Sequence, residues 1–419
     1  MKKAVIFGMF IGLIVAAVWL GIQGQVHLQA NNRFFDVQSI DTMKYSRDAA
    51  GDSSVTQQIP TLVEKVASLN PTHIAIGTPY DEEFYPILRT WVSEARKHHL
   101  KVWFRGNFSS WEGWFGYAKF QDPNQHHIKL KAFIAKHPEL FEDGDIFTPA
   151  PEPENGGVGD PRKETETKQR FFDFLILSYK TCHESFQKIN KNVQCGYFSM
   201  NGDVAKILTP DIIHQIGNRL IIDHYVKTPE ELGAAIDGYY AEYGSKIVIG
   251  EFGAPIPDLQ GDMTSEQQAG FIKNTLAEFI KRKDFVDGIN YWTAFGGSTA
   301  LFDGNLNPKP AAKLIASYYT PLQVQGRVLD GFGVPVYRAT VHTSSFLTTK
   351  TQRDGTYSLL TTVDFPQVTV EKERFGRQTF TISSTDKSVI IVKNVTLSNQ
   401  KRGFFSEVLL LFSSLFKHN

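Results

Sequence analysis

The chain of 419 residues has no net charge and only two cysteines. Lysine and arginine together number 44, as do aspartate and glutamate. A chain balanced in this way has no overall field to hold a polyanion, and no basic patch stands out along the sequence, so we expect no nucleic-acid partner. Because 42% of the residues are hydrophobic, disorder over most of the length is excluded as well.

Sequence motifs for cofactors and metals are missing too. The chain has no G-x-G-x-x-G, no P-loop, no H-E-x-x-H and no calcium loop. The histidine pairs at 98–99 and 126–127 are adjacent residues of predicted helices, where neighbouring side chains point apart. We therefore expect neither a cofactor nor a bound metal ion.

The two cysteines match no metal-site spacing. Cys182 falls in a predicted helix and Cys195 in the strand that follows it. In an exported protein they could form a disulfide, but two buried thiols that pack as small hydrophobic groups would fit the same positions. The sequence leaves both alternatives open.

The N-terminus contains a long hydrophobic run. Lys2 and Lys3 precede residues 4–22, which carry no charge. A helix of this length, at about 1.5 Å per residue, nearly crosses a hydrocarbon core of roughly 30 Å. No good cleavage site follows, so we expect a transmembrane signal anchor over residues 1–24 and a linker over 25–35. The two lysines favour a cytoplasmic N-terminus, and the remainder would face outward in a single-pass membrane protein, or be secreted if the run is cleaved.

Residues 36–320 alternate short apolar runs with amphipathic stretches, which predicts eight strand–helix units. Strands are expected at 39–45, 73–77, 101–105, 145–148, 193–198, 219–225, 246–250 and 288–292. Helical patterns cover 55–69, 83–99, 163–189, 229–243 and 265–283. Eight regular units favour the α/β fold class and a (β/α)8 TIM barrel, although other α/β folds stay open.

Catalytic residues of such a barrel lie at the C-terminal ends of its strands. Glu152 follows the fourth predicted strand and Glu251 the seventh, which places the two carboxylates across the barrel mouth from each other. Paired carboxylates can act as acid and nucleophile on a glycosidic bond. The ordinary alternative is an acidic turn around Glu152 and a solvated loop residue at Glu251.

These residues resemble clan A of the glycoside hydrolases over about two thirds of the chain. Gly250-Glu251-Phe252-Gly253 is similar to the clan's nucleophile motif, and Glu152-Pro153 to the end of its Asn-Glu-Pro motif. The resemblance implies a retaining mechanism with Glu251 as nucleophile and Glu152 as acid/base. Pro151 replaces the usual asparagine, which contacts the sugar 2-hydroxyl. Glu154, beside Asn155, is the alternative acid.

The resemblance also implies supporting residues near the two glutamates. His224 and Tyr225 close the sixth predicted strand, where a tyrosine hydroxyl could hold Glu251 ionised. Trp292 ends the eighth strand, where the clan has a tryptophan beneath a sugar. For all three, packing in the barrel wall is the alternative.

The loop after the third predicted strand gathers polar and aromatic residues. We expect Arg105, Asn107 and, from the fourth loop, Asn155 to contact substrate. Trp111 and Trp114 could serve as flat platforms for pyranose rings, or could form a small satellite core. Residues 44–48, which follow the first strand, could contact substrate, but bracing of the rim is the favoured expectation.

From residue 321 the pattern changes to short alternating strands, which predicts a β-sandwich over 321–398. Strands are expected at 324–329, 336–342, 345–349, 357–360, 367–372, 377–382 and 389–397. The Asp354-Gly355-Thr356-Tyr357 turn resembles the carboxypeptidase regulatory-like family, which implies a spacer without catalysis. Glycan binding is the sharper alternative.

The C-terminal tail, residues 399–419, holds an apolar stretch at 404–416 between basic residues. It is too short to span a bilayer and would either lie on the membrane or dock on the sandwich. Together these features predict an anchored, outward-facing retaining glycoside hydrolase whose partners are the membrane and a β-glucan or β-mannan oligo- or polysaccharide. The alternative is a non-catalytic glycan-binding or cell-surface adhesion protein; an inverting hydrolase would need a wider carboxylate gap.

Overall fold

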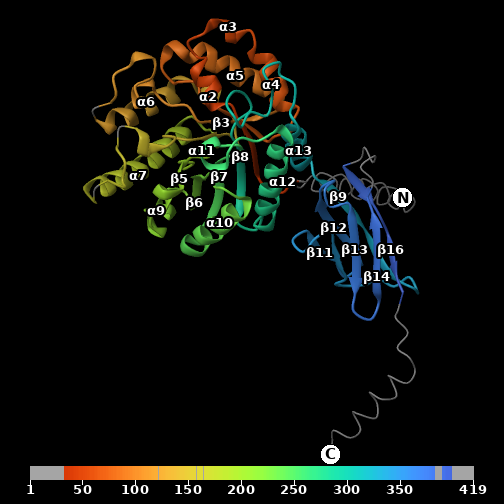
Figure 1. Cartoon of the computed structure of the whole chain (residues 1–419). Coiled ribbons are helices and arrows are strands. Elements are labelled where there is room, and N and C mark those ends of the chain that lie inside the picture. The colour runs from red at the N-terminus through yellow and green to blue at the C-terminus, as the bar shows by residue number, and fades with distance from the viewer. Residues whose placement is uncertain (1–32, 121, 157, 164, 383–388, 399–419) are drawn as a thin grey trace, which may run out of the picture. The chain divides into compact units, whose positions relative to one another are not determined.

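The computed structural model describes residues 33–398 except 121, 157, 164 and 383–388. The described residues form two compact units, one at Phe34–Thr320 and one that begins at Pro321 (Figure 1). The predicted anchor at 1–24, residues 25–32 of the linker and the tail at 399–419 lie outside the described residues. Among the helices that are described, none is long and apolar enough to cross a membrane.

The first unit is a (β/α)8 barrel, as predicted. Its parallel strands follow the order β4-β3-β2-β1-β8-β7-β6-β5, and a parallel bridge pairs Ile146 of β4 with Gln194 in the segment that precedes β5. The strands are β1 Val37–Asp41, β2 His73–Ile76, β3 Lys101–Phe104, β4 Ile146–Phe147, β5 Met200–Asn201, β6 Arg219–Asp223, β7 Lys246–Phe252 and β8 Val286–Tyr291.

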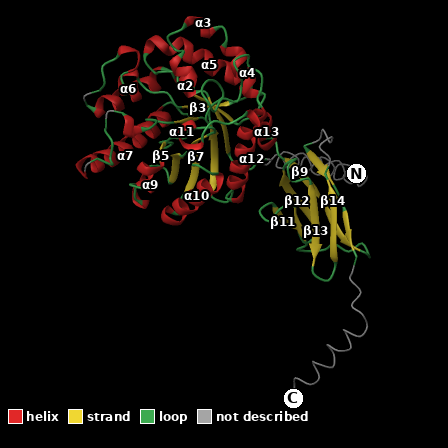
Figure 2. Cartoon of the chain, in the orientation of Figure 1, coloured by secondary structure: helices red, strands yellow, loops and turns green. Residues whose placement is uncertain are grey.

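Helices surround the barrel strands, as the red and yellow ribbons of Figure 2 show. The α-helices are α2 Met43–Asp48, α3 Ser53–Thr56, α4 Ile59–Ala67, α5 Tyr85–Lys97, α6 Pro123–Lys136, α7 Thr165–Lys188, α8 Gly202–Ala205, α9 Pro210–Gln215, α10 Pro229–Tyr243, α11 Pro257–Gln260, α12 Ser265–Lys281 and α13 Pro310–Tyr319. Short 3₁₀ helices lie at Glu82–Phe84, Ser109–Trp111, Trp114–Gly116, Pro138–Leu140 and Pro153–Asn155.

Local sequence explains where several of these helices begin and end. The side chains of Thr228 and Thr264 accept hydrogen bonds from the first turns of α10 and α12, and Thr264 forms a capping box with Gln267. Helix α10 ends at Tyr243, and the φ of 62° at the following Gly244 suits glycine. These caps satisfy backbone groups that the helices leave free at their ends.

Buried side chains from nearly all the strands fill the barrel interior. This cluster consists of Val37, Ala75, Trp103, Ile146, Tyr197, Ile221 and Val248. Because the interior is packed, the barrel has no open pore, and chemistry is confined to the loops at the strand ends.

Two of the predicted barrel strands differ most from the structure. The first ends at Asp41, and residues Met43–Asp48 form helix α2 instead of strand or loop. The fifth, expected at 193–198, is reduced to the bridge at Gln194 and the two residues of β5. Gly196 lies between them with φ of 82°, a left-handed conformation that interrupts strand pairing.

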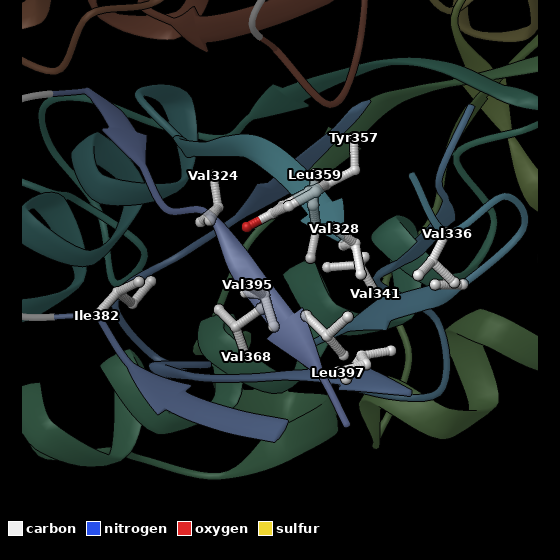
Figure 3. Close-up of a cluster of buried hydrophobic side chains, with 12 residues drawn as sticks. Val324, Val328, Val336, Val341, Tyr357, Leu359, Val368, Ile382, Val395 and Leu397 are labelled. Carbon is white, nitrogen blue, oxygen red and sulfur yellow. The ribbon is translucent and has the colours of Figure 1, made fainter. Parts of the chain in front are cut away.

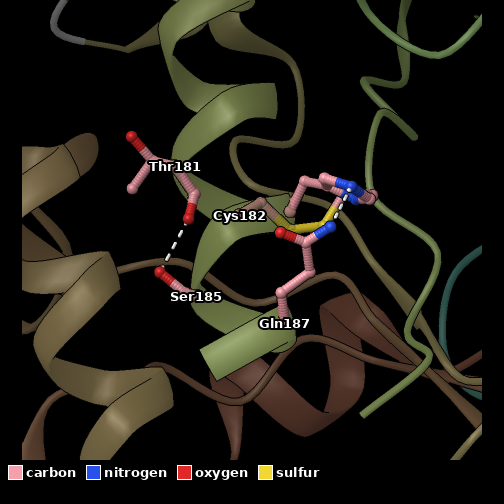
Figure 4. The surroundings of a disulfide bond; sticks show 6 residues. Thr181, Cys182, Ser185 and Gln187 are labelled. Carbon is pink, nitrogen blue, oxygen red and sulfur yellow. Dashed lines mark hydrogen bonds between the residues drawn. A yellow bond between two sulfur atoms is a disulfide. The ribbon is translucent and has the colours of Figure 1, made fainter. Parts of the chain in front are cut away.

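The two cysteines form a disulfide that ties helix α7 to the segment before β5. Cys182 and Cys195 have Cα atoms 6.1 Å apart, and Cys182 is fully buried (Figure 4). Of the two alternatives that the sequence left open, the structure has the bridge. It closes a short loop across the part of the barrel where strand pairing is weakest.

The second unit is a β-sandwich. One sheet has the order β11-β10-β13-β14; the other has the order β12-β9-β15, and β16 also pairs with β9. The strands are β9 Leu322–Asp330, β10 Thr340–His342, β11 Thr348–Lys350, β12 Thr356–Thr361, β13 Gln367–Lys372, β14 Gly376–Thr381, β15 Ile390–Val392 and β16 Val395–Leu397. Their inward side chains, among them Val324, Val341 and Leu359, form one core (Figure 3).

Candidate active site

The side chain of Glu251 lies near the C-terminal end of β7 and is held by groups from two other strand ends. Its Oε1 accepts a hydrogen bond from Arg105 Nη2 at 2.9 Å, and its Oε2 accepts one from the Tyr225 hydroxyl at 2.9 Å. Glu251 is only 6% exposed. Both carboxylate oxygens therefore have fixed donors, which restricts the orientation of the group.

Arg105 lies directly after β3 and connects four strand ends beneath the barrel mouth. Its guanidinium donates to Asp41 at 2.6 Å and to Ser199 Oγ at 2.8 Å, and contacts Asp223 at 3.4 Å, in addition to Glu251. Arg105 is fully buried. The planar, five-donor guanidinium suits this arrangement because a single ammonium group could not reach all these acceptors in fixed directions.

Two of the carboxylates around Arg105, those of Glu251 and Asp223, hold protons more tightly than usual. Burial raises the pKa of Glu251 to about 8 against the opposing charge of Arg105. Burial and the charge of Glu251 raise the pKa of Asp223 well above its usual range. Asp223 Oδ1 is buried without a hydrogen-bond partner in the described structure, whereas both oxygens of Glu251 accept hydrogen bonds. A proton held between Asp223 and Glu251 is therefore better placed on Asp223.

The glycines of the Gly250-Glu251-Phe252-Gly253 motif allow close packing. A Cβ atom on Gly250 would lie 2.4 Å from Asp223 Oδ1, and one on Gly253 would lie 2.2 Å from the Trp292 carbonyl oxygen. Neither position has room for a side chain. The motif thus brings β6 and β8 close to the strand that carries Glu251.

Tyr225 acts as a stable donor to Glu251. Burial, together with the charge of Glu251, raises the pKa of the Tyr225 hydroxyl well above its usual value, so the hydroxyl stays protonated. His224 contributes differently: its backbone N–H donates to the Glu251 carbonyl oxygen at 3.2 Å, and its ring packs against Tyr239. The structure therefore brings Tyr225, but not the imidazole of His224, to the carboxylate.

Glu152 and Glu154 lie after β4 in different surroundings. Glu152 has left-handed backbone angles, φ 42° and ψ 61°, is partly exposed, and donates its N–H to the Ser199 carbonyl oxygen at 2.9 Å. Its charge contributes to the raised pKa of Glu251. Glu154 is buried, and its Oε1 accepts from Asn201 N at 2.8 Å. The neighbouring Asn155 is exposed.

Glu154 makes the stability of the fold depend on pH. Burial raises its pKa to about 7, against about 4.3 for an unperturbed glutamate. Between these values the folded protein keeps a proton that the unfolded chain has lost, so stability falls as pH rises from about 4.3 to 7. We expect Glu154→Gln to remove this dependence and to gain about 3 kcal/mol over the native chain between pH 4 and pH 8.

Urea unfolding of the native chain, Glu154→Gln and the exposed control Glu230→Gln at several pH values measures this effect. The control should follow the native pH profile. Parallel profiles for Glu154→Gln and the native chain would show that Glu154 is ionised in the folded protein.

The predicted aromatic platforms differ in accessibility. Trp292 is half-buried directly after β8. Trp114 is half-buried, and the guanidinium of Arg47 lies 4.8 Å from its ring centroid. Trp111, by contrast, has no exposed surface and stacks on Phe174 with ring centroids 5.3 Å apart. Of the two alternatives that the sequence left open for Trp111, the structure has the satellite core and not the sugar platform.

Two further substrate contacts expected from the sequence also lie below the surface. Asn107 is fully buried, and its Oδ1 accepts hydrogen bonds from Phe108 N and from His126 Nε2. Arg105 is equally inaccessible. We therefore correct both assignments: Arg105 orients Glu251, and Asn107 braces the loop after β3. The alternation of apolar residues does not reveal this, because His126 and Glu251, which fix the two side chains, lie in other segments of the chain.

Several residues of the network were not predicted from the sequence. Asp41 ends β1 and accepts from Asn290 Nδ2 at 2.6 Å as well as from Arg105. Ser199 precedes β5, and Asp223 ends β6. The sequence pattern that could have identified them is a polar residue at the end of an apolar strand. In the described part of the chain, no group of three or more histidine, cysteine or acidic side chains gathers as metal ligands would.

A concavity of about 540 Å³ opens beside the ends of β1 and β8. Tyr45 and Phe295 contribute aromatic rings, with centroids 5.8 Å apart, and Asp303 and Lys309 add charges. A lining that combines aromatic rings with charged groups suits ligands that have both polar groups and apolar faces.

The barrel has the fold of glycoside hydrolase family 5 structures, which belong to clan A. A GH5_18 structure from Bifidobacterium longum subsp. longum, in complex with Manβ1-4GlcNAc, is 14% identical with a TM-score of 0.52, over 72% of this chain and 84% of that chain. One from Streptomyces cattleya with the same ligand is 14% identical with a TM-score of 0.53, over 70% and 85%. The sequence itself matches no family profile and no curated protein.

Proposed function

We propose that this protein is a retaining glycoside hydrolase with Glu251 as nucleophile and Glu152 as acid/base. The observation that carries the proposal is the double hydrogen bond from Arg105 and Tyr225 to Glu251 at the end of β7. Two donors stabilise the ionised carboxylate and aim it in one direction, as attack on an anomeric carbon requires. Glu152 follows β4, is partly exposed, and contributes through its charge to the raised pKa of Glu251.

In the proposed reaction, Glu251 attacks the anomeric carbon while Glu152 donates a proton to the departing glycosidic oxygen. Glu152, then ionised, accepts a proton from water, and the resulting hydroxide displaces Glu251 from the sugar. Arg105 and Tyr225 keep Glu251 oriented in both steps. Glu154 is the weaker candidate for the acid because it is buried and its Oε1 is engaged by the backbone of Asn201.

The proposed substrate is a β-linked glycan of the mannan or glucan class. The similar GH5_18 structures hold Manβ1-4GlcNAc, a β-mannoside, which supports this choice. Trp292 and Trp114 would lie beneath or beside sugar rings, and the concavity next to Tyr45 offers room for a further sugar. Pro151 offers no side-chain amide to the sugar 2-hydroxyl.

We also propose that the enzyme works outside the cytoplasm, held by its N-terminal segment. The disulfide between Cys182 and Cys195 supports this location because such bonds persist mainly in oxidising compartments.

Replacing the acid/base tests the proposal. We expect Glu152→Ala to lower turnover of a β-mannoside or β-glucoside with a natural sugar leaving group by about 10²- to 10⁴-fold. The first step on an activated aryl glycoside should keep its native rate in this variant, because that leaving group needs no proton. Glu154→Gln is the matched comparison and should keep natural turnover.

The opposite pattern, with natural turnover lost in Glu154→Gln and kept in Glu152→Ala, would assign the acid to Glu154. The configuration of the first product, followed by NMR, separates retention from inversion. Saturable glycan binding without turnover of any substrate would reject the hydrolase and favour a glycan-binding or adhesion protein.

A further inference from the structure

One end of the β-sandwich, where β9 finishes at Asp330, exposes large apolar side chains. The loop that follows carries Phe332, Val334 and Tyr337, which are 85%, 56% and 46% exposed. The loop has a defined conformation: Asp330 Oδ1 accepts from Phe332 N and from Val334 N at 2.9 Å each. Exposed apolar side chains held close together in an ordered loop indicate a binding surface.

A concavity of about 590 Å³ is lined by residues at this same end of the sandwich, and its lining is mainly basic. Its cations are Arg338, Lys350, Lys372, Arg374 and Arg377, against the carboxylates of Glu371 and Glu373. Glu371 is already paired with Arg377 at 2.7 Å. The concavity therefore keeps an excess of positive charge for which no ion-pair partner is present in the described residues.

Strand pairing assembles these charges from four segments. Thr340 of β10 pairs with Lys350 of β11 and with Glu371 of β13, and Glu371 pairs with Arg377 of β14. Arg338 precedes β10 and directly follows Tyr337 of the apolar loop; its guanidinium lies 5.6 Å from the Tyr337 ring. Lys372, Arg374 and Arg377 lie close together in the sequence but alternate with Glu371 and Glu373. The net basic cluster forms only when the strands also bring Arg338 and Lys350 to the same concavity. We call the apolar loop and these five cations the basic tip.

The chain also leaves the described sandwich at the basic tip. Strand β16 ends at Leu397, which pairs with Asp330 at the end of β9. In Figure 3, Val336 and Leu397 lie toward one end of the core, and Val324 and Ile382 toward the other. The sequence that follows Leu397 contains Lys401, Arg402 and the apolar stretch at 404–416.

We propose that the basic tip binds the surface of a membrane that contains acidic phospholipids. Apolar side chains that protrude beside a cluster of cations match the interface of such a membrane, where acyl chains lie next to negatively charged headgroups. The excess positive charge argues for an anionic surface. The exposed Phe332 and Val334 argue for a lipid rather than a soluble anionic polymer, because they can enter the acyl boundary.

A fluorophore attached at the loop tests the proposal on the full chain. Both native cysteines are in the disulfide, so Phe332→Cys introduces one reactive thiol for an environment-sensitive nitrobenzoxadiazole label. The matched control is Val392→Cys, an apolar position of β15 that is 67% exposed and lies outside the basic tip. The local readout separates the tip from any membrane binding by the two chain ends.

We expect the label at 332 to brighten and shift to the blue with vesicles of phosphatidylcholine and phosphatidylglycerol, and to stay unchanged with phosphatidylcholine alone. The label at 392 should not respond. Adding Arg374→Gln should lower the ratio of inserted to free tip about fivefold, since each cation near an acidic surface contributes about 1 kcal/mol. Lys131→Gln, an exposed cation of α6, should leave the ratio unchanged.

Three results would overturn the proposal. The first is no response of the label at 332 to either kind of vesicle. The second is an equal response to both kinds, which would show that charge has no role. A response to soluble polygalacturonate without a response to acidic vesicles would identify the basic tip as a site for anionic glycan.

Discussion

Glu251→Gln is expected to lower turnover of every substrate, activated aryl glycosides included, by about 10⁴-fold or more. The amide is nearly the same size as the carboxylate but cannot form the glycosyl–enzyme bond, so both steps of the double displacement lose their nucleophile. Steady-state rates at several pH values measure the loss. Glu230→Gln, an exposed change on α10, should retain native rates.

A chemical rescue separates loss of the nucleophile from loss of the fold. Glu251→Ala leaves space next to the anomeric carbon, and added azide should restore cleavage of an activated β-glycoside and yield the α-glycosyl azide. The inverted product arises because the external anion attacks from the face that Glu251 occupied. Native-like rates in Glu251→Gln would remove Glu251 from the mechanism, and a β-glycosyl azide would show that another residue supplies the nucleophile.

Arg105→Met is expected to lower the free energy of unfolding by about 3–5 kcal/mol and to abolish turnover. Removing the guanidinium leaves Asp41, Asp223 and Glu251 buried without their common cation, and breaking a buried pair in this way is costly. The carboxylates would then take up protons, so the deficit should be larger at pH 8 than at pH 5. Urea unfolding at both pH values measures it.

Arg377→Met provides the surface comparison. Arg377 pairs with Glu371 at 2.7 Å, but its side chain is 67% exposed, and such pairs contribute less than about 1 kcal/mol. Arg105→Lys keeps the charge without the planar set of donors and should fall between Arg105→Met and the native chain. Equal stability of Arg105→Met and Arg377→Met would show that the buried network does not stabilise the fold.

Periodic patterns in the sequence were sufficient to predict a barrel followed by a sandwich. Short apolar runs that alternate with amphipathic stretches predicted the barrel strands, and the change of pattern after residue 320 predicted the sandwich. Glu251 could also be found in this way, because the end of a buried strand with glycine on either side of a glutamate is a local pattern. Burial against a core is encoded residue by residue, so local patterns report it well.

Contacts between distant segments were decided only by the tertiary structure. Arg105 meets Asp41 and Glu251 because the closed barrel brings three strand ends to one point, and nothing near Arg105 in the sequence marks it as their partner. Glu152 and Glu154 are two residues apart, yet only one is buried. The disulfide and the basic tip also depend on contacts between separate segments that only the tertiary structure specifies.

The sequence by itself therefore determined the order of the eight barrel strands and the place of one glutamate at a strand end. The tertiary structure decided which polar groups share a site, because hydrogen bonds and charge pairs depend on distances in space that hydrophobic periodicity does not specify.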